Sequence, residues 1–253
     1  MRRTLIRPGL VVAALLALIA VAQTAVAQDR ESGPWWPHPI WGAEDQAGGS
    51  NWITPEVVLR AASLVKTGKV YELGQVYEHG MPLFGQRTYT MVIPGSPSGG
   101  PVGDNQLVWH DEFLCGEIGQ IGTQFDGPGH IGTHMRLADG SETEVFYNGF
   151  TLEEVKGTYG LQKLGVENIK PIFTRGILID IAGAKGVHVL EHSYEVTVAD
   201  VRQALQRQGV EESGIQPGDA LLFRYGWSKY WDQEDIYNLN PPGIGLEVAA
   251  WLA

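Results

Sequence analysis

The order of apolar segments in residues 176–227 constrains the fold more than any other feature of the sequence. GILIDIAG, residues 176–183, is a continuous apolar run rich in β-branched residues, a pattern typical of a buried strand. TVADVRQALQRQG, residues 197–209, has the caps and apolar spacing of a helix, and PGDALLFRYGW, residues 217–227, leads from a turn into another apolar strand. Strand, helix and strand in this order predict a mixed α/β fold.

The first 27 residues have the features of a secretory signal peptide. Arg2, Arg3 and Arg7 precede the apolar run LVVAALLALIAVA, and Ala25-Val26-Ala27 forms a small-residue cleavage site before Gln28. A membrane anchor is the alternative, but this run is shorter than the roughly 20 residues that span a bilayer. We therefore expect residues 1–27 to be removed and the mature protein to be periplasmic or secreted.

Composition limits the partners of the mature chain. The formal net charge of −11 becomes −14 on cleavage, because residues 1–27 carry three of the 18 Lys and Arg residues and no Asp or Glu. So acidic a chain is unsuited to nucleic acid and to anionic membrane surfaces. Cys115 is the only cysteine, which excludes an intramolecular disulfide, and we expect it to be a small buried residue.

Local patterns divide the rest of the chain. Residues 28–53 contain four tryptophans among prolines and glycines, and predict an extension that docks on the body of the protein. TPEVVLRAASLVKTG, residues 54–68, predicts a helix with a threonine cap and a glycine stop. A strand and a turn are expected within residues 69–84, and a flexible, lid-like loop in residues 92–103.

The segment GQIGTQFDGPGH, residues 119–130, carries the candidate chemistry. Its four glycines and its proline predict an irregular loop, because these residues oppose a continuous helix. A metal-binding loop is one interpretation, since a carboxylate, an imidazole and two amide oxygens all offer lone pairs; these are the side chains of Gln120, Gln124, Asp126 and His130. The alternative is a structural turn, for which Asp, Gln and Gly are ordinary residues.

This loop resembles the HxGTHxDxPxH signature of the cyclase family of metal-dependent hydrolases, which includes bacterial kynurenine formamidase and isatin hydrolase. Five of the seven fixed positions match, and glutamines stand where the first two histidines are usual; the matches are Gly122, Thr123, Asp126, Pro128 and His130. The flanking segments GMPLFG, TRGILIDIA and GIQPGDALLFRYGW also resemble the family, in the family's order. The resemblance covers most of residues 70–253.

The resemblance implies a site and a reaction. It makes Gln120, Gln124 and Asp126 the metal-binding residues, His130 the proton donor and acceptor, and Phe84 a substrate-binding residue. The implied reaction is attack of activated water on an amide, cyclic amide or lactone carbonyl of a small-molecule substrate, as in an arylformamidase. Two amides in place of imidazoles favour Mn²⁺ over Zn²⁺.

The resemblance also implies the architecture. We expect a single mixed-sheet domain of the swivelling β/α/β type in residues 54–253, in a homo-oligomer as is common among the related enzymes. In the family the chain continues past the helix that begins at GLEVAAWLA into a strand and further metal ligands, so we expect the C-terminal part to be missing here. Two alternatives remain: a hydrolase of unsaturated lactones resembling trans-dienelactone hydrolase, and a metal-free binding protein on the same fold.

Other histidines compete for a role in metal binding. HIGTHMRLADG, residues 130–140, itself contains HxGTH, which would place metal on His130 and His134, but this register lacks the aspartate of the motif. We therefore keep His134 as a reserve ligand. His188 and His192 lack a carboxylate at the expected spacing and are expected to be surface residues.

Overall fold

The structure is a computed structural model that describes residues 33–253. The expected signal peptide of residues 1–27 lies outside these residues, so its cleavage stays a prediction. None of the helices within the described part is long and apolar enough to cross a membrane.

The chain forms two compact units, which are described separately. The first unit contains residues 131–163 together with the described residues up to Gln46, and the second contains residues 47–130 and 164–253. The expected division into an extension of residues 28–53 and a domain of residues 54–253 stays a prediction.

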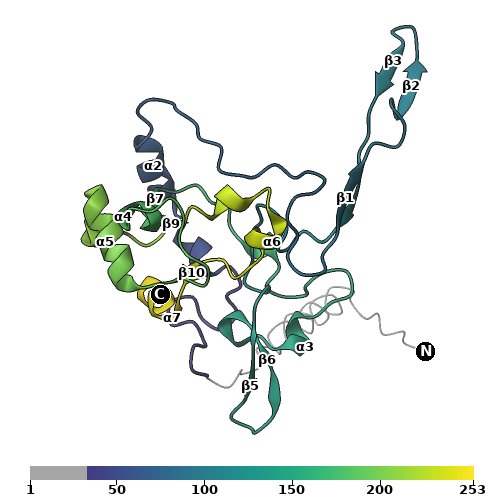
Figure 1. Ribbon diagram of the computed structural model, residues 1–253. Helices are drawn as coiled ribbons and strands as arrows, with labels where there is room; N and C mark the ends of the chain where they lie inside the picture. Colours follow the sequence, from purple (N-terminus) through teal and green to yellow (C-terminus); the bar gives the residue numbers. More distant parts are fainter. Residues whose placement is uncertain (1–32) are drawn as a thin grey trace, which may run out of the picture. The chain divides into compact units, whose positions relative to one another are not determined.

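The second unit contains most of the secondary structure (Figure 1). Its strands are β1 (Tyr89–Val92), β2 (Gly99–Val102), β3 (Leu107–Trp109), β4 (Phe113–Gly116), β7 (Gly176–Asp180), β8 (Glu195–Val196), β9 (Ala220–Arg224) and β10 (Gly243–Ile244). Its α-helices are α2 (Pro55–Ser63), α4 (Ile181–Ala184), α5 (Val198–Gln208), α6 (Glu234–Tyr237) and α7 (Leu246–Leu252). Its short 3-10 turns are η1 (Gly48–Trp52), η3 (Val166–Asn168), η4 (Glu212–Gly214) and η5 (Trp227–Tyr230).

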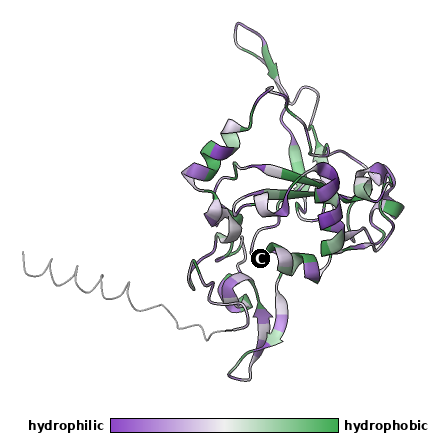
Figure 2. Cartoon of the chain, turned by 90° about the vertical axis from the view of Figure 1, so that its left-hand side faces the viewer, coloured by the Kyte–Doolittle hydropathy of each residue, from purple (hydrophilic) through white to green (hydrophobic). Residues whose placement is uncertain are grey.

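The strands of both units pair in twos. In the second unit, β1 pairs with β4 and β2 with β3 in antiparallel fashion, whereas β7 with β9 and β8 with β10 are parallel. The helices between the strands carry both hydrophobic and hydrophilic residues (Figure 2). The structure therefore confirms a mixed α/β fold, built from small sheets.

The core of the second unit lies where α5 packs beside the β7–β9 pair (Figure 1). Thr197 caps α5 by accepting from the backbone N–H of Asp200 while the Asp200 carboxylate accepts from that of Thr197, and Gly209 ends the helix in the left-handed conformation. The predicted helix is thus confirmed. The strand at residues 176–180 is also confirmed, but Ile177 and Ile179 are buried whereas Leu178, on the other face, is 47% exposed.

Four expectations for the region before the loop are corrected. The helix after Thr54 is confirmed but stops at Ser63, before the predicted glycine. No strand forms within residues 69–84, because alternation favours an extended chain but no neighbouring strand pairs with it. The expected loop in residues 92–103 is partly strand, since its second half forms β2 and pairs with β3. Cys115, expected to be buried, is exposed on β4.

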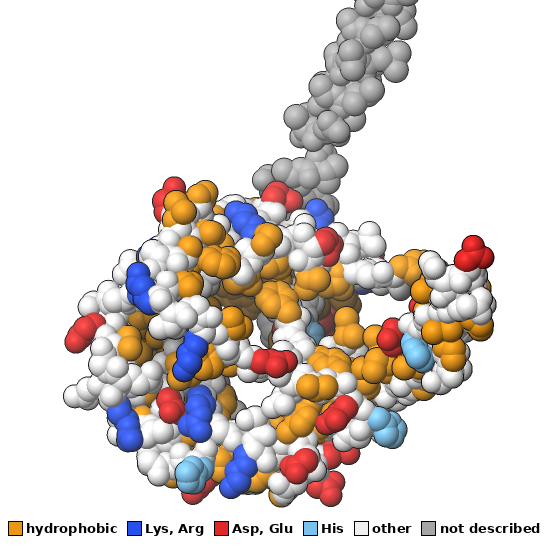
Figure 3. Space-filling view, turned by 90° about the horizontal axis from the view of Figure 1, so that it is seen from above, with side chains coloured by type: hydrophobic (Ala, Val, Ile, Leu, Met, Phe, Trp, Pro, Cys, Tyr) orange, Lys and Arg blue, Asp and Glu red, His pale blue; other side chains and the backbone are white. Residues whose placement is uncertain are grey.

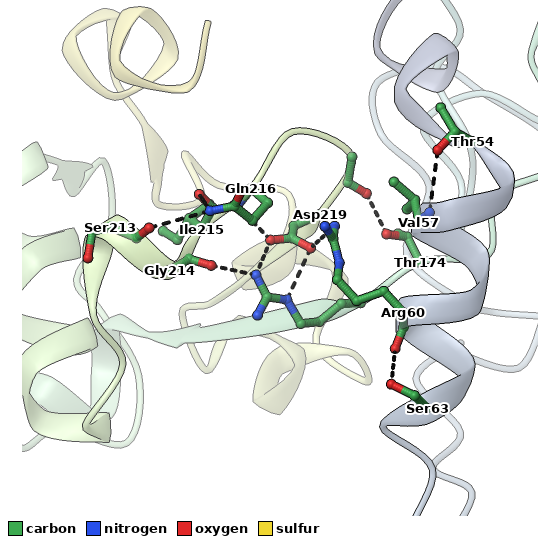
Figure 4. Close-up of polar contacts among 12 residues, drawn as sticks. Thr54, Val57, Arg60, Ser63, Thr174, Ser213, Gly214, Ile215, Gln216 and Asp219 are labelled. Atoms are coloured by element: carbon green, nitrogen blue, oxygen red, sulfur yellow. Dashed lines mark hydrogen bonds and ion pairs between the residues drawn. The ribbon is translucent and has the colours of Figure 1, made fainter.

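A buried carboxylate connects α2 to the parallel strands (Figure 4). Asp219, whose side chain is 1% exposed, accepts from Nε of Arg175 at 3.1 Å and lies 3.3 Å from Nη2 of Arg60. The backbone N–H of Gln216 donates to the same carboxylate at 2.8 Å. Burial alone would raise the pKa of Asp219, but Arg175, this backbone N–H and Arg60 lower it, so the group stays ionised. The Asp219 cluster thus fixes the turn before β9.

The first unit holds the hairpin β5 (Thr133–Arg136) and β6 (Glu142–Val145), the short turn η2 (Tyr147–Gly149) and the helix α3 (Leu152–Val155). Asn148 anchors its N-terminal residues: its side-chain amide donates to the carbonyls of Gly42, Ala43 and Asp45 and accepts from the N–H of His38. Trp36 is buried in this unit, whereas its neighbour Trp35 is 47% exposed.

Candidate metal centre

Residues 119–130 form the irregular loop expected from their glycines and proline. The side chain of Ile121 is fully buried and its backbone bridges to Leu83, which fixes the loop to the chain before β1. Gln120 and Gly122, on either side of Ile121, both have positive φ angles of 62° and 64°. The backbone therefore turns sharply around one buried anchor, and the neighbouring polar side chains are held outward.

The loop brings the four predicted side chains into one series of contacts. Nε2 of Gln120 lies 3.3 Å from Nε2 of His130, and that imidazole nitrogen lies 3.6 Å from Oδ1 of Asp126. Nε2 of Gln124 donates to both carboxylate oxygens of Asp126, at 3.3 and 3.4 Å. The order of contact is therefore Gln120, His130, Asp126, Gln124.

Backbone contacts set the positions of these side chains. Oε1 of Gln124 accepts from the N–H of Ile121 at 3.1 Å, which folds the glutamine back over its own loop. The N–H of His130 donates to the carbonyl of Gly127 at 3.0 Å and closes a turn through Pro128. The side chains of Asp126 and His130 remain 42% and 33% exposed, so water and a small ligand have access to them.

Phe84 lies beside this loop. Its N–H donates to the carbonyl of Gln120 at 3.3 Å, and its ring is 48% exposed. The guanidinium of Arg87 lies 5.6 Å from the centre of that ring, and its Nη1 donates to the carbonyl of Phe84. An exposed aromatic ring, with a guanidinium group close to it, thus lies beside the loop.

Sequence reasoning missed the residues that support the loop from behind. Tyr77 packs its ring on Gly122, where an added Cβ would lie 2.5 Å from a ring carbon, and its hydroxyl donates to the carbonyl of Thr123. Asn238 donates from Nδ2 to the carbonyl of Leu83 at 2.9 Å. A glycine in the loop, Gly122, could have indicated that another residue packs closely against the backbone there. It could not have indicated that this residue is Tyr77.

The other histidines make separate contacts. His134 lies on β5 of the first unit, with Nδ1 3.4 Å from Glu144 and Nε2 3.9 Å from Glu142. His192 is exposed, and its Nδ1 lies 2.7 Å from the carbonyl of Leu239; His188 is exposed as well. Within residues 33–253, no three His, Cys, Asp or Glu side chains come together as a metal site.

Comparisons with known proteins agree with the fold. The model of the Cyclase family, described as "Putative cyclase", matches residues 71–253, which include the Phe84 turn and the whole Gln120–His130 loop. A crystal structure described as that of a novel cyclase is 31% identical with a TM-score of 0.69, and the match covers 84% of this chain and 70% of that one. No curated protein matches the chain significantly. The chain therefore belongs to the cyclase family.

Proposed function

We propose that this chain is a metal-dependent hydrolase that acts on an amide, cyclic amide or lactone carbonyl, in the manner of an arylformamidase. The observation that carries the proposal is the convergence of Gln120, Gln124, Asp126 and His130 in a segment that the cyclase family model covers. In this proposal Gln120, Gln124 and Asp126 bind the metal ion, and His130 transfers the proton.

The spacing of the side chains fits a shared ion. Ligand atoms each about 2.1 Å from one metal ion stand roughly 3 to 3.5 Å apart. The 3.3 Å between Gln124 and Asp126 joins two proposed ligands and falls within this range. The other two separations, of 3.3 and 3.6 Å, end on His130, which stands beside the ligands as the proton carrier. The amide oxygens of Gln120 and Gln124 reach the same space when the amide groups rotate, because oxygen and nitrogen occupy equivalent positions at the end of the side chain.

The chemistry of the donors indicates which ion is held. Asp126 is the only anionic member of the set, and both glutamines offer neutral oxygens. Such oxygen donors suit Mn²⁺ better than Zn²⁺, which prefers imidazole and thiolate ligands. We therefore propose a manganese-preferring site of modest affinity.

The residues of the loop have distinct roles in the proposed reaction. A bound divalent ion supplies Lewis acidity and lowers the pKa of water. His130, whose Nε2 faces Asp126 at 3.6 Å, takes a proton from the attacking water and returns it to the leaving nitrogen or oxygen. The buried Ile121 anchor keeps these groups in place, so little reorganisation is needed when the substrate binds.

Phe84 offers a surface for a planar substrate. Its half-exposed ring stands next to Gln120, so an aryl or unsaturated ring stacked on it would bring a carbonyl toward the loop. The same surface suits an unsaturated lactone, which keeps a hydrolase resembling trans-dienelactone hydrolase as the alternative.

One contact favours a second candidate, a metal-free binding protein. Both ends of the Gln124 amide are engaged by protein groups, with its oxygen on Ile121 and its nitrogen on Asp126. The carboxylate is therefore hydrogen-bonded without an ion. This arrangement would persist in a protein that binds its ligand without hydrolysing it.

A substrate panel distinguishes the candidates. N-formyl arylamines, isatin-like lactams and unsaturated lactones are incubated with chelator-treated protein, with and without added Mn²⁺ or Zn²⁺. We expect metal-dependent turnover that Asp126→Ala abolishes and that His130→Ala lowers by about 10²- to 10⁴-fold with metal still bound. Metal-independent ligand binding with no turnover would instead support the binding protein, and equal loss of metal in both variants would make His130 a ligand.

A further inference from the structure

Residues 69–80 run beside the candidate site without joining a sheet. No strand forms in them, and four of their apolar side chains are between 68% and 92% exposed: Val70, Tyr71, Leu73 and Val76. Hydrophobic side chains are also exposed elsewhere on the face of the molecule seen from above (Figure 3), so their exposure does not mark a binding surface. The contacts that this segment makes are more informative than its exposed side chains.

The hydrogen bonds of this segment converge on one residue of the loop, Thr123. The backbone N–H of Gln75 donates to Oγ1 of Thr123 at 2.8 Å, and the hydroxyl of Tyr77 donates to the backbone carbonyl of Thr123. Within residues 33–253, residues 69–80 make no other hydrogen bond with a residue more than three positions away. The segment therefore holds both the side chain and the backbone of Thr123.

The ring of Tyr77 adds a packing contact to these hydrogen bonds. It lies against Gly122, where an added Cβ would be 2.5 Å from a ring carbon, and the φ angle of 64° at Gly122 also favours glycine. The ring of Tyr89 on β1 meets that of Tyr77 edge-on, with 5.6 Å between the ring centres. Tyr77 therefore contacts both the loop and β1, and its position is fixed independently of its hydroxyl.

The hydroxyl of Tyr77 acts on the part of the backbone from which Gln124 extends. The carbonyl of Thr123 and the N–H of Gln124 belong to the same peptide group, which is planar and rigid. A hydrogen bond to this carbonyl therefore restricts the rotation of the whole group. The Gln124 side chain then lies where its amide reaches both Asp126 and the N–H of Ile121.

We propose that Tyr77 is a positioning residue of the candidate metal centre, whose hydroxyl sets the position of Gln124 relative to Asp126. Tyr77 itself contacts neither the ion nor the substrate. The effect on metal binding rests on the proposed function, whereas the effect on the loop does not. Groups behind metal ligands change metal affinity by about 10- to 100-fold when they are removed. Because Tyr77 acts through the backbone, we expect the lower end of this range, about tenfold.

A pair of matched variants tests the effect on metal binding. Tyr77→Phe keeps the ring on Gly122 and removes only the hydroxyl. The control Tyr89→Phe removes the hydroxyl of the neighbouring ring, which lies 4.0 Å from Sδ of Met91 and does not contact the loop. In equilibrium dialysis, we expect the Kd for Mn²⁺ to rise about tenfold in Tyr77→Phe and to stay within about twofold in the control.

Two further measurements separate positioning from a general loss of stability. Tm should fall by less than about 3 °C in both variants, because each loses one contact near the surface. The EPR lines of Mn²⁺ bound at saturation should broaden in Tyr77→Phe alone, because ligands that are held less firmly adopt a wider range of geometries.

Hydrogen exchange measured by NMR tests the loop without metal or substrate. The N–H of Ile121 donates to Oε1 of Gln124, so its exchange rate reports whether Gln124 is in place. In chelator-treated protein, we expect this amide to exchange about three- to tenfold faster in Tyr77→Phe than in the wild type, and at an unchanged rate in Tyr89→Phe. The N–H of His130, which donates to the carbonyl of Gly127, should keep its rate in both variants.

Each outcome supports or overturns the role of Tyr77. Equal exchange of the Ile121 amide in the wild type and in Tyr77→Phe would overturn it. Binding of Mn²⁺ that Tyr77→Phe weakens no more than Tyr89→Phe does would also overturn it, as would faster exchange throughout the second unit with a much lower Tm, which would mean that the hydroxyl supports the fold. If the wild type binds no Mn²⁺ but the Ile121 amide exchanges faster in Tyr77→Phe alone, the proposed function fails and the positioning of Gln124 by Tyr77 stands.

Discussion

Replacement of Asp219 by asparagine tests how the second unit is held together. The carboxylate is almost fully buried and is shared by Arg175 and Arg60, while Gln216 donates a backbone N–H to it. Asp219→Asn keeps the shape of the side chain but removes its negative charge. It also replaces one carboxylate oxygen by an NH2 group, a donor that faces the donors of the neighbouring residues. Two guanidinium groups are then left without a counter-charge beside α2 and β9.

The expected loss in the free energy of unfolding follows from how deeply these groups are buried. Removing one partner of a buried ion pair costs about 3 to 5 kcal/mol. The side chains of Arg175 and Arg60 are 27% and 38% exposed and can regain water, so the lower end of that range applies. We expect the free energy of unfolding to fall by about 3 kcal/mol, which lowers Tm by roughly 6 to 12 °C for a domain of this size.

Urea unfolding followed by tryptophan fluorescence measures this loss. The matched control is Glu212→Gln, which removes an exposed carboxylate that pairs with Arg202 on the surface. The control should cost less than about 1 kcal/mol, because exposed ion pairs contribute little. A loss below about 1 kcal/mol for Asp219→Asn would refute the reasoning and show that the Asp219 cluster is solvated in solution.

Three further predictions concern other sites. The pKa of Asp200 is lowered to about 2: burial alone would raise it, but Lys185 and Thr197 lower it. Its contribution of roughly 2 kcal/mol is therefore present above about pH 4 and lost as pH falls toward 2, so urea midpoints of wild type and Asp200→Asn should converge at pH 2. Asn148→Ala should lower the free energy of unfolding by about 3 kcal/mol, because buried carbonyls lose their donor; an unchanged Tm would contradict this. Gln120→His with Gln124→His should raise the ratio of bound zinc to manganese in competitive loading, and an unchanged ratio would place the glutamines outside the coordination sphere.

Local sequence signals predicted the helices well. Thr197 and Asp200 at one end of α5, and Gly209 at the other, act within a few residues of one another, so the sequence alone defines the helix. The same is true of α3, where Thr151 and Glu154 form a capping box from residues three positions apart. Such interactions do not depend on distant parts of the chain.

Strand pairing was predicted less well because it depends on distant partners. The alternation in residues 69–84 indicated an extended chain, but pairing also requires a free edge nearby, which no local pattern reports. For the same reason the exposure of Leu178 and Cys115 was missed, since both lie on faces that no described element covers.

In the candidate site, too, the local features were predictable and the contacts with distant segments were not. The motif indicated Gln120, Gln124, Asp126 and His130, which lie within one short loop, and the structure brings them together. The supports of that loop come from other segments and were not predictable, because Tyr77 and Asn238 carry no motif.

Equilibrium dialysis against Mn²⁺ tests the central claim, that the Gln120–His130 loop binds a divalent metal ion. It compares the wild type with Asp126→Ala and with Asp104→Ala, which removes the same charge from the exposed end of the β2–β3 hairpin. We predict about one Mn²⁺ per wild-type chain, unchanged in Asp104→Ala, and at least tenfold weaker binding in Asp126→Ala, since Asp126 is the only anionic group of the set. Equal binding by all three proteins, or no stoichiometric binding by the wild type, would contradict the account.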